Sequence, residues 1–197
     1  EPTPFEDELN KILTSFKEKM EKKHGLLLWS SGWMVAGKSS SNISEIRTKC
    51  MYRYPTSCQE ARALMLLAIE KLLTALNKSE TLRPYLKEYP FSASQLKLRM
   101  LFRNQKYFVG DVPYYNGSLD SAVLNRNVII YYHHIPSTED SRLHDRVVYA
   151  KESYQEAQKI IENTPPPTTS EKINNVIKTF IINFSNFLDS AILIFFL

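Results

Sequence analysis

Residues 57–77 read SCQEARALMLLAIEKLLTALN, and this stretch decides the fold. Ser57 is followed three residues later by Glu60. In this capping-box pattern, each side chain bonds the backbone N–H of the other residue at the start of a helix. Apolar side chains then recur at helical spacing and extend round most of the helix circumference. Such a helix needs cover on several sides, so we predict a central helix wrapped by the rest of the chain.

The composition is that of one globular domain, with room for a small additional element. Of 197 residues, 43% are hydrophobic and 23% are charged, which argues against disorder. The net charge is +4, from 25 basic and 21 acidic residues. Because this excess is small and dispersed, we expect no nucleic-acid partner. The sequence also lacks an uninterrupted apolar run of about 18 residues, the length that an ordinary membrane-spanning helix needs.

Two predicted strands, over 43–54 and 96–103, have side chains that alternate in character. In each, one face is apolar or small and the other is largely basic. The basic residues of the two strands are Arg47, Lys49, Arg53, Lys97, Arg99 and Arg103. Such alternation is typical of a strand with one buried and one solvated face, so we predict two half-buried strands with basic outer faces.

The remaining elements complete a predicted α+β fold. They are a helix over 5–24, a strand over 26–36 with a bulge at Gly32, strands over 107–112 and 128–135, and a helix over about 143–162. The order of helices and strands predicts an antiparallel sheet built from two β-β-α units, with the helices mainly on one face.

A proline-rich segment divides the chain. Residues 165–169 (PPPTT) form a stiff, extended linker, so we predict an α+β domain over 1–164 and a tethered element over 165–197. Apolar residues recur at helical spacing from Ile173 to Leu197 and predict an amphipathic C-terminal helix. This helix must cover its own domain, a partner or a membrane surface. Its polar face is rich in Asn and poor in Lys, unlike that of membrane-surface helices, so we favour packing on protein.

Residues 32–39 (GWMVAGKS) match the phosphate-binding pattern G-x-x-x-x-G-K-S. We reject a nucleotide site, because bulky residues fill the segment where the backbone must curl round a phosphate. No helical stripe follows Ser39, so no helix N-terminus is available to hold the anion. We therefore expect no cofactor.

The two cysteines, Cys50 and Cys58, lie close together in the sequence. An even count at short spacing fits one disulfide in an oxidising compartment, and we favour this pairing. A second interpretation is two reduced thiols without a special role. In a third, Cys58 is reactive, because a thiol at a helix N-terminus has a lowered pKa.

Candidate catalytic residues are few. A hairpin could bring His133, His144 and Asp145 together as a metal site, but their spacing is not diagnostic. We favour one strand histidine buried with a hydrogen bond and the others in solvent. A nucleophilic Cys58 paired with a histidine is the other enzymatic hypothesis. We therefore expect no metal and no catalytic residues, and a protein that binds rather than catalyses.

Three short motifs, Glu60-Ala-Arg62, Leu82-Arg-Pro-Tyr-Leu86 and Tyr89-Pro-Phe91, precede an alternating strand. In this combination the segment from Gly32 to Ile161 resembles a group of small exported α+β proteins of intracellular bacteria that have no assigned activity. The resemblance implies an exported α+β domain and transfers no catalytic residues.

The chain begins with Glu1-Pro-Thr-Pro4 and no methionine, as after removal of a signal peptide or trimming. With the cysteine pair, this leads us to expect a secreted or periplasmic protein. Our leading hypothesis is a non-enzymatic exported or envelope-associated domain that binds another protein, or a second copy of itself through the C-terminal helix. The alternative is a thiol- or metal-dependent hydrolase that uses Cys58 or the His133/His144/Asp145 site.

Overall fold

The computed structural model describes residues 4–36, 42–54, 56–102, 119–136 and 144–164, and for residues 134–136 and 144–146 it describes the backbone alone. The chain divides into two compact units, residues 1–161 and 162–197, and the first is described here by itself. The predicted C-terminal helix and the predicted strand over 107–112 lie outside the described residues.

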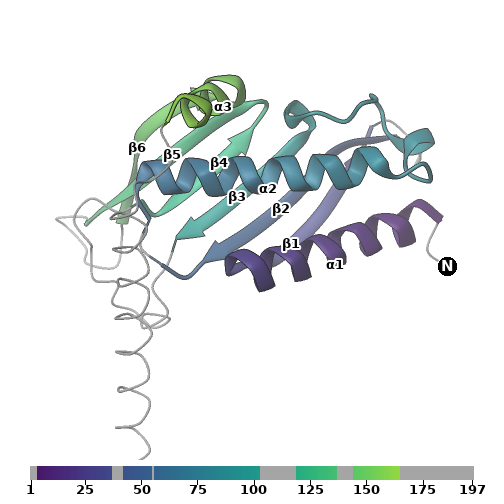
Figure 1. Ribbon diagram of the computed structural model, residues 1–197, viewed down its shortest axis with the longest axis horizontal. Helices are drawn as coiled ribbons and strands as arrows, with labels where there is room; N and C mark the ends of the chain where they lie inside the picture. Colours follow the sequence, from purple (N-terminus) through teal and green to yellow (C-terminus); the bar gives the residue numbers. More distant parts are fainter. Residues whose placement is uncertain (1–3, 37–41, 55, 103–118, 137–143, 165–197) are drawn as a thin grey trace, which may run out of the picture. The chain divides into compact units, whose positions relative to one another are not determined.

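Helices and strands alternate in an α+β fold (Figure 1). The helices are α1 (Pro4–His24), α2 (Cys58–Lys78) and α3 (Tyr154–Asn163). The strands are β1 (Leu26–Val35), β2 (Ile43–Tyr52), β3 (Leu96–Phe102), β4 (Ser121–Asn125), β5 (Val128–Pro136) and β6 (His144–Ser153). Two short 3-10 turns, Arg83–Tyr85 and Ala93–Gln95, lie between α2 and β3.

The strands form one mixed sheet in chain order, β1-β2-β3-β4-β5-β6. β2 and β3 run parallel, and every other neighbouring pair is antiparallel. Our prediction of an antiparallel sheet therefore differs at the β2–β3 pair. The physical reason is that α2 connects these strands and crosses the sheet between them (Figure 1), and parallel neighbours need such a crossover. The second unit also differs from a β-β-α unit, because four strands, β3 to β6, precede α3.

Helix α2 lies at the centre of the core, as predicted. The capping box is confirmed: the Glu60 N–H donates to Ser57 Oγ at 3.2 Å, and the Ser57 N–H donates to Glu60 Oε2 at 2.9 Å. A fully buried large apolar side chain contributes roughly 1.5–3 kcal/mol relative to exposure. The buried residues of α2 are Ala61, Met65, Leu66, Ala68, Ile69, Leu72 and Leu76, and those of α1 are Phe5, Leu9, Leu13, Phe16 and Met20.

The last third of the domain differs most from the prediction. β6 occupies residues 144–153, where we predicted the first half of a helix, and α3 begins only at Tyr154. β4 has no counterpart in the prediction. It joins β5 through a two-residue turn, Arg126 and Asn127, whose φ angles are +47° and +66°. Positive φ at both positions is the geometry of a type I′ hairpin turn, and Asn favours it.

The Asn77 side chain fastens the end of α2 to the segment before β3. Its Nδ2 donates to the Phe91 carbonyl oxygen at 2.8 Å, and its Oδ1 accepts from the Phe91 N–H at 2.7 Å. Phe91 is buried, so one amide satisfies both polar backbone groups of a core residue. Beside it, the Arg83 guanidinium lies 4.3 Å from the centre of the Tyr89 ring. Residues of two motifs quoted above thus have structural roles.

We expect Asn77→Ala to lower the free energy of unfolding by about 2–3 kcal/mol, because it leaves the Phe91 N–H and carbonyl without partners. Urea unfolding followed by circular dichroism measures this loss. Asn125→Ala, at an exposed asparagine of β4, is the control and should change the free energy by no more than about 0.5 kcal/mol. Equal losses in the two variants would contradict the fastening role of Asn77.

Candidate functional site: the open face of the sheet

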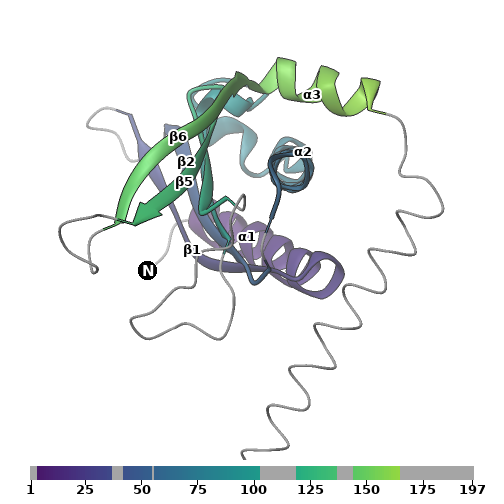
Figure 2. The same ribbon diagram turned by 90° about the vertical axis from the view of Figure 1, so that its left-hand side faces the viewer.

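The sheet has one face under the helices and one face that no described helix covers. Figure 2 shows α1, α2 and α3 on the same side of the strands. Along β2 and β3, side chains alternate between the two faces. Thr48, Cys50, Leu98 and Met100 are buried on the helix side, and the residues between them point the other way. We call the side of β1–β6 away from the helices the open face.

Four basic residues meet at the centre of the open face. The parallel register places Arg47 opposite Lys97 and Lys49 opposite Arg99. Neighbouring strands lie about 4.8 Å apart, so each of these side chains has a like charge beside it on the next strand. Like charges directly opposite on a sheet are destabilising. We call these four residues the cation cluster.

Little negative charge offsets the cation cluster. Glu45 forms an ion pair with Arg47, and Arg99 has an interaction of its own. In the part of the chain that the structure describes, the side chains of Lys49 and Lys97 have no hydrogen bond or ion pair. The charged residues of the open face and of the extension of β2 whose side chains are described are Arg47, Lys49, Arg53, Lys97, Arg99, Lys151 and Glu45. The open face is therefore electropositive.

The neighbours of the cation cluster on β1 and β4 carry no charge. Gly32 of β1 stands opposite Arg47, and a Cβ atom at Gly32 would meet no atom within 4 Å. The Arg47 side chain is 50% exposed. On the other side, β4 places Val123 and Asn125 opposite the cluster residues of β3. Arg47 is thus accessible, and uncharged residues border the cluster on β1 and β4.

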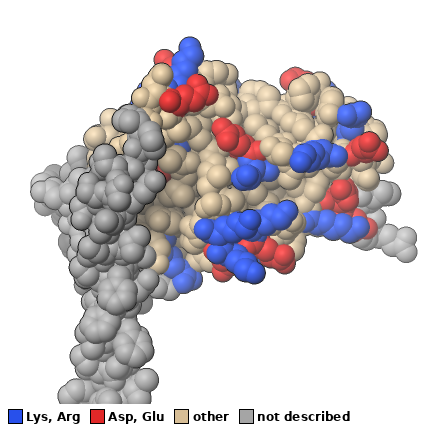
Figure 3. Space-filling view, in the orientation of Figure 1, with Lys and Arg blue, Asp and Glu red and all other residues tan. Residues whose placement is uncertain are grey.

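The helix side of the molecule has a different distribution of charge. Figure 3 shows that its Lys and Arg side chains are interspersed with Asp and Glu. Helix α1 illustrates this mixture, since its lysines alternate with Glu18 and Glu21 in the last two turns. The concentration of one sign of charge is a property of the open face.

A bulge in β1 places Trp29 at the margin of the sheet. The residues on either side of Trp29 pair with Cys50 and Lys49, which are consecutive in β2, so Trp29 is the extra residue of the bulge. Its exposed fraction is 60%, the largest among the exposed large hydrophobic residues that are described. The predicted bulge at Gly32 was wrong in position, because the register is regular there. Bulges commonly redirect a side chain at a sheet edge, and this one turns Trp29 into solvent.

Trp29 lines a shallow groove where α1, β1 and the end of β2 meet. Its volume is about 380 Å³, near the lower limit of ligand sites, which is roughly 300 Å³. We call it the Trp29 groove. Its lining residues are Lys17, Glu21, Leu27, Leu28, Trp29, Met51 and Arg53.

Cys58 lies beside a largely buried ionic network on the helix side. Arg62 Nε donates to Glu152 Oε1 at 2.8 Å, and the Tyr131 hydroxyl donates to the same oxygen at 2.5 Å. The Arg62 and Glu152 side chains are 14% and 10% exposed. Arg62 Nη2 is 4.0 Å from Cys58 Sγ. The network joins the start of α2 to β5 and β6, so its evident role is structural.

The surroundings of Cys58 make it a weak nucleophile. Burial raises the pKa of its thiol, Arg62 lowers that pKa by less, and Glu152 raises it again. Catalytic thiols have a lowered pKa, so the shift has the wrong sign for a reactive Cys58. Burial and the hydrogen bond to Glu152 likewise raise the pKa of the Tyr131 hydroxyl, which stays protonated.

The structure does not contain the Cys50–Cys58 disulfide that we favoured from the sequence. Both residues are free thiols. Cys50 points from β2 into the core, where it is 1% exposed, and burial raises the pKa of its thiol to about 12. This arrangement agrees with the second interpretation of the sequence, in which both cysteines are reduced thiols.

The predicted histidine site is only partly within the described residues. His133 packs edge-on against Tyr149, with ring centres 4.5 Å apart. The side chains of His144 and Asp145 lie outside the described residues. Among the side chains that are described, no cluster of three or more His, Cys, Asp or Glu residues could hold a metal ion.

The phosphate-binding pattern at residues 32–39 falls on a different structure from a phosphate loop. β1 continues through Gly32 to Val35 as a strand, and residues 37–39 lie outside the described residues. The next described element is β2. A phosphate loop needs a curled backbone that leads into a helix, and neither is present among the described residues here.

Comparison with models of known protein families, with curated proteins and with solved structures finds no match to this chain. Within the described residues, no helix is both long and apolar enough to span a membrane.

We expect Cys58 to react slowly with iodoacetamide at neutral pH, because its raised pKa leaves little thiolate. The rate should increase as the pH rises, and Cys50 should react only on unfolding. Mass spectrometry of native Cys50→Ala and Cys58→Ala variants measures each thiol by itself. Rapid labelling of Cys58 at or below neutral pH would contradict this expectation and support the thiol-hydrolase alternative.

Proposed function

We propose that this protein is a non-enzymatic binding domain that docks an acidic partner protein on the open face of its sheet. The observation that carries the proposal is the cation cluster. Its members stand opposite one another on adjacent strands, and Glu45 is the one acidic residue among the described side chains of that face. An acidic partner would supply the missing counter-charges.

The cation cluster opposes folding and favours binding. A like-charge pair directly opposite on a sheet is destabilising, and the register contains two such pairs. A partner carboxylate placed between Lys49 and Lys97 would replace this repulsion with attraction. Because exposed ion pairs contribute at most about 1 kcal/mol each, the cluster would supply orientation and a fast association rate more than affinity.

The residues around the cluster favour an acidic protein over a nucleic acid. Proteins that bind single strands combine cations with aromatic rings on which the bases stack. Here the residues that border the cluster on β1 and β4 are Ser30, Gly32, Val123 and Asn125. None of these four is aromatic, and the bulge turns Trp29, the residue before Ser30, to the margin of the sheet. The cluster itself therefore lacks a stacking platform.

The other parts of the sequence hypothesis remain proposals. An exported or envelope-associated location gains no support from Cys50 and Cys58, because both are thiols. The proposed contact on the open face does not depend on the compartment. A further contact of the C-terminal helix with a partner or a second copy concerns residues outside those described. The hydrolase alternative is weakened by the raised pKa of Cys58.

The test is a charge reversal with a charge-matched control. We expect Lys49→Glu combined with Lys97→Glu to weaken binding of a fluorescent polyglutamate peptide by at least about tenfold at low salt. Fluorescence polarisation measures the affinity. Lys19→Glu combined with Lys71→Glu makes the same change in net charge on exposed positions of α1 and α2, and should weaken binding by less than about twofold.

Two outcomes would contradict the proposal. Equal losses in the two double variants would mean that net charge, and not the cation cluster, attracts the peptide. Tighter binding of a single-stranded oligonucleotide or of anionic phospholipid vesicles than of polyglutamate would identify a different class of partner. The reversed cluster should unfold at no lower temperature than the wild type, because Glu at position 97 would face Arg47.

Gly32→Val should separate binding from stability. A Cβ atom at this position meets no other atom within 4 Å, and Gly in a strand is destabilising by roughly 0.5–1 kcal/mol relative to Ala. We therefore expect the variant to be more stable by about that amount. The added side chain beside Arg47 should hinder a partner and weaken polyglutamate binding by about threefold or more. Thermal unfolding and polarisation measure the two effects, and unchanged binding would place the partner away from this edge.

A further inference from the structure

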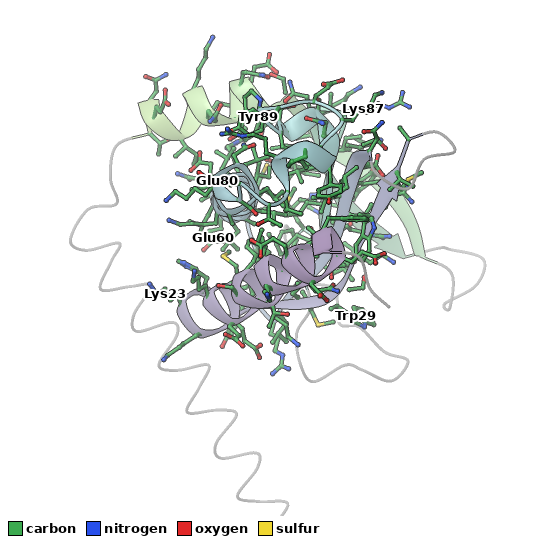
Figure 4. All side chains as sticks on the ribbon, turned by 90° about the vertical axis from the view of Figure 1, so that its right-hand side faces the viewer. Lys23, Trp29, Glu60, Glu80, Lys87 and Tyr89 are labelled. Carbon is green, nitrogen blue, oxygen red and sulfur yellow. The ribbon has the colours of Figure 1, made fainter. Side chains whose placement is uncertain are left out.

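Trp29 is an unusual surface residue because it has no partner that explains its exposure. Tyr149 and Tyr89 are also exposed, but Tyr149 packs against His133 and Tyr89 holds the Arg83 guanidinium. Within the described residues, Trp29 has no ring contact, and no cation stacks on its ring. Figure 4 shows Trp29 at the lower margin beside α1, at the opposite end of the view from Tyr89.

The Trp29 groove is continuous with the cation cluster. Lys49, Met51 and Arg53 follow one another at alternate positions of the same strand and its extension, so they share a face. Met51 lines the groove and Lys49 belongs to the cluster. The groove therefore begins where the cluster ends, and one partner segment could contact both.

The charges of the groove indicate what would fill it. Its lining is apolar at Leu27, Leu28 and Met51, and Lys17 and Arg53 carry positive charge against the single carboxylate of Glu21. An uncharged apolar ligand would leave this positive excess without a counter-charge. An apolar side chain flanked by carboxylates would match both the lining and the charge.

We infer that the Trp29 groove binds an apolar side chain of the acidic partner and anchors the interface of the open face. This inference rests on the proposed function. The physical reason is that exposed charge pairs orient a partner but contribute little affinity, whereas interfaces gain most of their affinity from a few aromatic or apolar anchors. The bulge in β1 presents such an anchor beside the cluster.

The test compares two fluorescent peptides on the full chain. One is a glutamate-rich peptide with a central Leu-Leu pair, and the other has Ser-Ser in its place. We expect the leucine peptide to bind the wild type about tenfold more tightly than the serine peptide. Trp29→Ala should abolish this gain and leave the affinity for the serine peptide unchanged within about twofold. Trp29→Phe, which keeps an aromatic ring, should retain most of the gain.

Met34→Ala is the matched control. Met34 is an exposed apolar residue of the same strand and does not line the groove, so its removal should leave the gain unchanged. A spectroscopic measurement reports on the groove itself. In a Trp33→Phe variant, Trp29 is the one remaining tryptophan, and its emission should shift to shorter wavelength with the leucine peptide but not with the serine peptide.

The outcomes distinguish the anchor from the proposed function. If neither peptide binds the wild type, the proposed function fails. If both peptides bind equally, or if the gain persists in Trp29→Ala, the anchor fails and the proposed function stands. The anchor would also be overturned if Trp29→Ala abolished binding of both peptides, or if Met34→Ala abolished the tighter binding of the leucine peptide as Trp29→Ala does. In either case the effect would not be specific to the groove.

Discussion

The connection through α2 is the constraint on which the rest of the structure depends. β2 leads into a helix that crosses the sheet before the chain returns as β3, so the two strands must run parallel. The helix is held there because its apolar circumference is buried against the sheet and α1. The parallel register then places Arg47 beside Lys97 and Lys49 beside Arg99. The charge pattern of the open face is therefore a consequence of packing on the other face.

Local patterns predicted the elements better than they predicted how the elements associate. The capping box at Ser57 and Glu60 and the stripe of α1 depend on neighbours along the chain, and both are present. The direction of β3 relative to β2 depends on the connection between them. The alternation of side chains within one strand does not indicate that direction. For the same reason, the sequence identified two basic outer faces but not that they adjoin. Because β2 and β3 are adjacent, their basic residues form one cluster that could bind a partner.

The errors near β6 have a different cause. Residues 147–161 contain apolar side chains at spacings that fit a helix, and β6 passes into α3 without an intervening loop. A second capping-box pattern marks the true helix start. The Glu156 N–H donates to Ser153 Oγ at 3.1 Å, and the Ser153 N–H donates to Glu156 Oε2 at 2.7 Å. β4 was missed because its turn uses Arg126 and Asn127 in place of the Asn-Gly pair that usually signals a hairpin.

Burial determines the reactivity of Cys58, which the sequence identified as a candidate nucleophile. The N-terminal position of Cys58 on α2 favours a lowered pKa, but burial of the thiol raises the pKa and outweighs the opposite effect of Arg62. Trp29 carries no sequence signal of its own, because its exposure depends on where the bulge falls in β1. The side chains of Arg47 and Lys49 are exposed on the open face and lie outside the core. The fold would accept Thr, Gln or a mixture of charges at positions 47, 49, 97 and 99, as α1 accepts a mixture on its own surface. Packing does not require four cations at adjacent positions of β2 and β3, and their repulsion works against the fold. That independence from the core is what makes the cation cluster informative about binding.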